Sequence, residues 1–207
     1  ITDNVIHGNS AKNKGGVSIR IHQPGSFTFE GNIVSNNTAG SNIGGAYFSI
    51  DTYDDNTSSS ISNNIFSQNS AVLFGAIDLH LVRSNNWQSS KPISVNTFTG
   101  NTIAYNTTTG WEGTEPQFMR LSGDGLFSEN NFIGNNGQIY LANSVDAPDL
   151  NANNNWWDTS SMIELDTLMY DWNDDATLGL VDYTPFLTAP DTTAPPSPPA
   201  NIAAQTG

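Results

Sequence analysis

Cysteine is absent from the 207 residues, and basic residues are scarce: six Lys and Arg stand against twenty Asp and Glu. Without cysteine there are no disulfide bonds, so packing and hydrogen bonds alone stabilise the fold. The formal net charge of −14 argues against nucleic acid and anionic membranes as partners, because both repel an acidic surface. Cations, sugars and proteins are the partner classes that this composition leaves.

Long apolar runs are also missing. No stretch approaches the roughly 18 apolar residues that a membrane-spanning helix needs, and the first ten residues, ITDNVIHGNS, lack the basic start and apolar middle of a signal peptide. Charged residues make up only 13%, whereas Ser, Thr, Asn and Gly are frequent, a composition typical of extracellular all-β solenoids. Either a signal peptide has been cleaved or, as we expect, the sequence is one part of a longer chain.

The most prominent pattern is an asparagine, an apolar residue two positions later and a second asparagine three positions further on. Copies begin at Asn4, Asn32, Asn64, Asn96 and Asn131, with a degenerate copy at Asn155. They advance by 28, 32, 32, 35 and 24 residues, which matches one turn of a three-sided β-solenoid with variable loops. Asparagine tolerates left-handed backbone angles at a bend and can hydrogen-bond its equivalent one turn on, so we expect asparagine ladders.

A strand with alternating apolar residues, usually led by glycine, follows each asparagine pair: GGVSIRI, GGAYFSI, FGAIDLHL, PQFMRL and GQIYLA. Alternation places every second side chain in the interior. The inward set is Val17, Ile19, Ile21, Ala46, Phe48, Ile50, Ile77, Leu79, Leu81, Met119, Leu121, Ile139 and Leu141. The sequence therefore predicts an all-β parallel β-helix over residues 1–152, with three short strands per turn and about six coils.

The composition changes after residue 152, so residues 153–190 are predicted to form a C-terminal cap. One short helix is expected within SSMIELDTLMYDW, with Ser160 or Ser161 as N-cap and Glu164 in its first turn. The aromatics expected to close the apolar end are Trp156, Trp157, Tyr170, Trp172, Tyr183 and Phe186. Residues 191–207, rich in Pro and Thr, are predicted to form a stiff, extended linker towards another module.

The stretch DWNDDA within the cap presents hard oxygen ligands for calcium at Asp171, Asn173, Asp174 and Asp175. It lacks the glycine at the sixth position and the distant glutamate of an EF-hand loop. A solvated acidic turn is the alternative interpretation. No motif requires a cofactor, so calcium is the one candidate.

The outward positions of the alternating strands collect much of the scarce positive charge. The candidate binding residues are Arg20, His22, Tyr47, Asp78, His80, Arg120 and Tyr140. The expected register puts Arg20, Ser49, His80, Arg120 and Tyr140 in one column, with Asp51 and Asp78 beside it. Arginine suits carboxylate or sulfate groups and tyrosine can stack on sugar rings, so this face predicts a site for an acidic sugar chain.

The same face also permits a catalytic interpretation. For β-elimination, an Arg, His or Tyr side chain would remove the proton next to a uronate carboxylate; for hydrolysis, Asp51 and Asp78 would act as acid and base. The residues of such a site would be Arg20, Asp51, Asp78, His80 and Arg120. A solvated sheet face without function is the third alternative.

Two stretches carry a family resemblance. NIFSQNSAVLFGAIDL and NIVSNNTAGSNIGGAYFSI resemble the Phe-x-x-Asn and Gly-Gly-Ala-Ile repeats of the polymorphic outer membrane protein family, whose members are surface adhesins on a right-handed parallel β-helix. The resemblance covers residues 4–81 well and 96–142 weakly. The segment from NNNWWD to YTPFL is similar to the closing segment of secreted β-helix proteins related to pectate lyases, and DTTAPPSPPANIAAQTG resembles the start of a fibronectin type III domain.

These resemblances imply a secreted or cell-surface protein of a bacterium or archaeon, with a right-handed helix. The expected function is that of a non-catalytic module of a larger protein, acting in adhesion, in carbohydrate binding or as a stalk. A uronate-polysaccharide lyase or a glycoside hydrolase is the alternative. The expected partners are a polysaccharide, a cell-surface glycan or protein, and other modules of the same chain.

Overall fold

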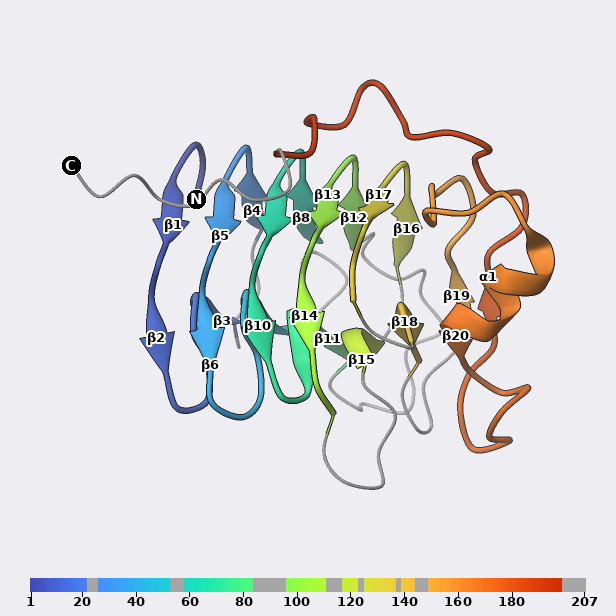
Figure 1. Ribbon diagram of the computed structural model, residues 1–207, viewed down its shortest axis with the longest axis horizontal. Helices are drawn as coiled ribbons and strands as arrows, with labels where there is room; N and C mark the ends of the chain where they lie inside the picture. The colour runs from blue at the N-terminus through green and yellow to red at the C-terminus, as the bar shows by residue number, and fades with distance from the viewer. Residues whose placement is uncertain are drawn as a thin grey trace.

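The computed structural model describes residues 1–21, 26–52, 58–83, 96–110, 117–122, 125–136, 139–143 and 149–198. Within these ranges, the backbone alone is described at 51–52, 80–83 and 117–122. Almost all regular structure is β-strand, and the strands stack in parallel into a β-solenoid that runs the length of the molecule (Figure 1). The predicted all-β parallel β-helix is confirmed.

Each complete turn contains four strands rather than the predicted three. The first turn has β1 (Val5–His7), β2 (Ser10–Ala11), β3 (Val17–Ile21) and β4 (Ser26–Glu30). The second has β5 (Ile33–Ser35), β6 (Thr38–Ala39), β7 (Ala46–Thr52) and β8 (Ser58–Ser62). The third has β9 (Ile65–Ser67), β10 (Ser70–Ala71), β11 (Phe74–Arg83) and β12 (Thr97–Thr99). The fourth has β13 (Thr102–Ala104), β14 (Thr107–Thr108), β15 (Gln117–Ser122) and β16 (Leu126–Ser128).

The later turns are incomplete. They contain β17 (Asn131–Ile133), β18 (Leu141–Ala142) and β19 (Leu150–Asn151), then α1 (Met162–Leu168), β20 (Met169–Tyr170) and β21 (Val181–Asp182). The sheet orders are β1-β5-β9-β13-β17, β14-β10-β6-β2, β20-β18-β15-β11-β7-β3 and β21-β19-β16-β12-β8-β4. Four turns therefore contribute to all four sheets, so the predicted count of about six coils is too high.

Two asparagine ladders run along the stack. One joins Asn4, Asn32, Asn64, Asn101, Asn130 and Asn155, and the other joins Asn9, Asn37, Asn69, Asn106 and Asn135. In the fourth turn the ladder pair is Asn101/Asn106, five residues after the predicted pair Asn96/Asn101. In the following turn it is Asn130/Asn135, one residue before the predicted pair Asn131/Asn136. The spacing fits both registers, and the structure selects the one that buries Ile103 and Phe132 in the middle of the motif.

Glycine is required where the Gly-led strands begin, because adjacent turns approach very closely there. A Cβ atom on Gly16 or Gly45 would lie 2.2 Å from a carbonyl oxygen of the next turn, and one on Gly75 would lie 2.3 Å from the Thr107 oxygen. Such contacts exclude any side chain. The preceding residues Lys14, Ile43 and Phe74 lie opposite one another in successive turns.

The interior is a continuous stack of apolar side chains. Phe29, Ile61, Phe98 and Phe127 pair in register along one sheet and are at most 2% exposed. Every member of the predicted inward row whose burial is described lies in this core or packs against it, apart from Ile139, which is buried at a corner. Successive turns bury one another's apolar face, which explains the repetition.

At the C-terminal end, α1 and Trp157 contribute to the buried core. Ser161 is the N-cap of α1 and accepts a hydrogen bond from the Glu164 N–H, while Leu165 is fully buried. Trp157 is fully buried and stacks on Phe132 with centroids 4.4 Å apart. Trp172, predicted to close the core, is instead 55% exposed.

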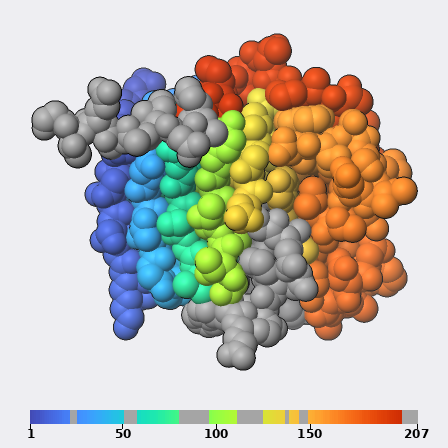
Figure 2. Space-filling model, viewed as in Figure 1, coloured from blue at the N-terminus to red at the C-terminus, as the bar shows by residue number. Residues whose placement is uncertain are grey.

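The segment after the cap returns along the solenoid. It runs from the capped end back over the coils, and the space-filling view shows it along the upper rim (Figures 1 and 2). Asn131 holds the backbone of Asp191 through two hydrogen bonds of 2.8 and 2.7 Å, and Thr102 donates to the Pro195 oxygen. The described part of the expected linker, residues 191–198, is thus attached to the solenoid at these two points.

Candidate functional site

By backbone register, the alternate positions of the sheet β20-β18-β15-β11-β7-β3 that were predicted to face outward fall into two rows. One row pairs Ser18, Tyr47, Asp78, Arg120, Ala142 and Tyr170. The other pairs Arg20, Ser49, His80 and Ser122. The predicted column is therefore correct for Arg20, Ser49 and His80 but wrong for Arg120, which belongs to the row of Tyr47 and Asp78. A slip of two residues preserves the inward and outward sets, so alternation alone could not detect it.

A cluster of two cations and one aromatic ring lies at the start of these rows. Lys14 Nζ is 3.4 Å from the centroid of the Tyr47 ring, and Arg20 Cζ is 5.5 Å from it. Arg20 is exposed, Lys14 and Tyr47 are half-buried, and Asp78 is only 2% exposed. We call Lys14, Arg20, Tyr47 and Asp78 the cation cluster.

Electrostatic effects within the cluster are visible at Lys14. Its pKa is lowered by partial burial and by the positive charge of Arg20, while the charge of Asp78 acts in the opposite direction. The ring quadrupole of Tyr47 attracts both cations. The cluster contains two positive charges and one carboxylate, so it is locally cationic on a chain whose net charge is −14.

The sequence alone did not identify Lys14 as a residue of the site. It occupies the position before the double glycine, where the next two turns have Ile43 and Phe74. Both of those side chains are buried, at 3% and 7% exposure. A lysine in the place of buried apolar residues was the available signal, because a cation there needs a partner, which Tyr47 supplies.

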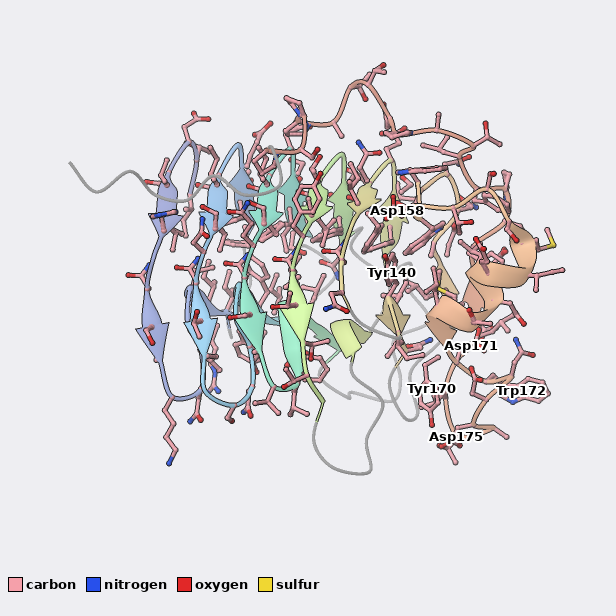
Figure 3. All side chains as sticks on the ribbon, in the orientation of Figure 1. Tyr140, Asp158, Tyr170, Asp171, Trp172 and Asp175 are labelled. Atoms are coloured by element: carbon pink, nitrogen blue, oxygen red, sulfur yellow. The ribbon has the colours of Figure 1, made fainter. Side chains whose placement is uncertain are left out.

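Several predicted site residues do not join the cluster. Tyr140 is not on the surface: it is 7% exposed, its ring stacks on Phe132, and its hydroxyl donates to the Asn135 oxygen. Burial and the charge of Asp158 raise the pKa of Tyr140 to about 12 (Figure 3). Tyr140 lies in an incomplete turn just before β18, where the alternation no longer places residues correctly. His22 lies outside the described residues.

The backbone register separates Asp51 and Asp78, the two residues proposed as an acid and base pair. Asp78 is opposite Tyr47, whereas Asp51 is opposite Val82, four residues further along the strand. At about 3.3 Å per residue along the strand and about 4.8 Å between neighbouring strands, the Cα atoms of Asp51 and Asp78 are separated by roughly 14 Å. A pair of glycosidase carboxyl groups needs about 5 to 9.5 Å, so this spacing does not favour the hydrolytic interpretation.

The acidic turn of the cap lies at the opposite end of the molecule from the first coil (Figure 3). Asp171 is buried, and its two carboxylate oxygens accept backbone N–H groups from Asn173 and Val181. The Asp174 carboxylate accepts the N–H of Asp171. The pKa of Asp175 is lowered because its carboxylate accepts hydrogen bonds from the N–H and hydroxyl of Thr177.

These contacts give the acidic turn a structural role of its own. Over the part of the chain that the structure describes, no group of three or more His, Cys, Asp or Glu side chains is arranged to hold a metal ion. Calcium binding at Asp171, Asn173, Asp174 and Asp175 stays a prediction. No helix among the described residues is long and apolar enough to cross a membrane.

Comparison with known proteins gives no relative. No family model, no curated protein and no solved structure matches the chain. The function is therefore inferred from the chemistry of the cation cluster and the architecture of the solenoid.

Proposed function

We propose that the chain is a non-catalytic extracellular solenoid module that binds an acidic polysaccharide through the cation cluster. The observation that carries the proposal is the convergence of Lys14 and Arg20 on the Tyr47 ring, next to the outward face of the longest strands. Two cations at one end of a flat sheet suit the carboxylate or sulfate groups of a glycan. An adhesin or a stalk in a larger surface protein would use such a face.

The position of the cluster favours an anion over a neutral sugar. The Tyr47 ring already contacts the Lys14 ammonium at 3.4 Å, so its role here is to hold the cations rather than to stack on a sugar ring. Arg20 is exposed and can form a bidentate contact with a carboxylate. The negative charge of the rest of the chain is screened beyond about 8 Å at physiological salt, whereas contacts within the cluster are shorter than that.

The experiment is a titration of the protein with polygalacturonate and, in parallel, with neutral dextran. We expect binding of the acidic polymer only. Arg20→Ala should weaken it by about tenfold, equivalent to roughly 1.4 kcal/mol, and Arg120→Ala should weaken it as well. Lys12→Ala is the matched control, because Lys12 is an exposed cation of the same coil outside the cluster. Equal losses for Arg20→Ala and Lys12→Ala would refute a specific site.

The enzymatic alternative is tested in the same samples. A lyase would generate unsaturated uronates, which are detected by their ultraviolet absorbance, and a hydrolase would release reducing ends. The backbone register supports this alternative at one point, since it places Asp78 opposite Arg120. If either polysaccharide is turned over, and Asp78→Asn abolishes that turnover, an enzymatic function would replace the binding proposal.

A further inference from the structure

The two ends of the solenoid differ in how their core is covered. At the first turn the inward side chains Ile6, Val17, Ile19, Ile21 and Phe27 are only partly buried. The partners of the first four one turn on, Val34, Ala46, Phe48 and Ile50, are fully buried. At the far end α1 lies over the last turns (Figure 1), and Leu165 of α1 and Trp157 belong to the buried core. The first turn thus presents an apolar face and four strand edges, β1 to β4.

The asparagine ladders give this face a direction. In every step the backbone N–H and the Nδ2 group of one asparagine donate to the Oδ1 atom of the asparagine one turn later. Asn37, for example, donates to Asn69 Oδ1 at 3.0 Å through both groups. The relation is never reversed, so each turn presents donors to the turn that follows and acceptors to the turn that precedes.

The acceptors of the first turn are open. Across the described part of the chain, nothing donates to Asn4 Oδ1 or to Asn9 Oδ1, whereas Asn32 Oδ1 and Asn37 Oδ1 each receive two donors. The backbone at Ile1 already follows the path of one more turn: Thr2 lies opposite Glu30, the Ile1 amino group donates to the Thr28 oxygen and the Glu30 N–H donates to the Ile1 oxygen.

The polarity of the ladders argues against a second copy of the chain as the occupant. Two copies that meet through this face form an isologous contact, which would set Oδ1 acceptors against Oδ1 acceptors. In a head-to-tail contact the second copy would have to offer the donors of the last residues of its two ladders: Asn135, which is buried and whose Nδ2 group donates to the Ile103 oxygen, and Asn155. That residue is fully buried, and its Nδ2 group donates to Phe127, Ala152 and Asn153 oxygens.

We propose that the first turn is a docking face for a further β-solenoid coil stacked in the same direction, which donates a backbone N–H and an asparagine Nδ2 group to Asn4 Oδ1 and to Asn9 Oδ1. The interface repeats the contact that already joins the coils of this chain. It covers the partly exposed apolar face and pairs the edges of β1 to β4, which otherwise invite unspecific strand pairing.

The test adds one coil to the chain. A copy of residues 1–28 placed before Ile1 continues in phase, because Ile1 is equivalent to Phe29, and a copy of residues 29–60 does so as well, because Phe29 is opposite Ile61. The amides of Val5 and Ser10 report on docking, since their equivalents Ile33 and Thr38 donate to the preceding turn. We expect their hydrogen exchange to slow by about tenfold or more and the unfolding midpoint to rise by a few degrees.

The matched control is the same added coil with both of its ladder asparagines changed to aspartate. This keeps the size but replaces each Nδ2 donor with a carboxylate oxygen that faces Oδ1, so protection of Val5 and Ser10 should fall. If neither added coil protects these amides, or if the aspartate version protects them equally, the proposal is wrong. Dimerisation of the 207-residue chain that Val5→Lys abolishes would also overturn it, because the occupant would then be a second copy.

Discussion

Replacing an asparagine in the interior of a ladder should lower the free energy of unfolding far more than replacing the asparagine at the N-terminal end of the same ladder. Asn69 is fully buried, and its side chain takes part in four hydrogen bonds. Its Oδ1 atom accepts from the N–H and Nδ2 of Asn37 at 3.0 Å, and its Nδ2 group donates to Asn106 Oδ1 at 3.0 Å and to the Val34 oxygen at 2.9 Å.

The loss of stability expected for Asn69→Ala follows from the hydrogen-bonding groups that the substitution leaves without a partner. The buried N–H of Asn37 loses its partner, which costs about 1 to 3 kcal/mol, and each of the other bonds contributes roughly 0.5 to 1.5 kcal/mol net. Since some partners keep a second bond, we expect a total loss of about 3 to 5 kcal/mol. That is a large part of the roughly 5 to 15 kcal/mol by which domains are stable.

Urea unfolding followed by circular dichroism measures the difference, provided that the m-value is unchanged. Asn9→Ala is the control: Asn9 is exposed, and its side chain contributes one bond, to Asn37 Oδ1, so its loss should stay near 1 kcal/mol. If the two variants lose the same stability within about 0.5 kcal/mol, the buried part of the ladder does not stabilise the interior more than its exposed end.

Three further predictions concern the close approach of turns, the buried tyrosine and the cap. Gly45→Ala places a Cβ atom 2.2 Å from a carbonyl of the next turn and should cost about 3 kcal/mol or more, whereas Gly40→Ala meets nothing closer than 3.6 Å and should be nearly neutral by thermal unfolding. Because the pKa of Tyr140 is raised from 10.0 to about 12, stability should be complete below pH 10 and fall as pH rises towards 12, by up to about 2.7 kcal/mol; Tyr140→Phe should flatten that slope in urea titrations, and an unchanged slope would contradict it. Leu165→Ala should cost about 2 to 5 kcal/mol, while Ile163→Ala, in the same helix but 83% exposed, should cost little; equal unfolding midpoints would show that α1 does not cover the core.

The fold was predictable because its two strongest signals are local. Alternation identified the inward residues, and the pairs Asn4/Asn9, Asn32/Asn37 and Asn64/Asn69 set the register of the first three turns correctly. Beyond them, Asn96, Asn101 and Asn106 offer two overlapping choices with the same spacing. Only stacking on the neighbouring turn decides between them, and that information is not local.

The site was predictable in part, for the same physical reason. The alternation of inward and outward positions placed Arg20, Tyr47 and Asp78 on one face correctly. The row to which Arg120 belongs depends instead on the number of residues between β14 and β15 that lie outside the strands. Lys14 interrupts an apolar position, so its role becomes apparent only when its turn is stacked under Tyr47. The two-residue strands such as β2 were missed because they are too short to show periodicity.

The most direct test of the proposed function is a map of amide chemical shifts during titration with an oligogalacturonate. If the cation cluster binds acidic glycans, the largest shifts will occur at Arg20, at Tyr47 and at the glycines after Lys14, with no comparable effect of a neutral oligosaccharide of equal length. Shifts confined to the cap around Asp171, or none at saturating ligand, would contradict the assignment of acidic-glycan binding to the cation cluster.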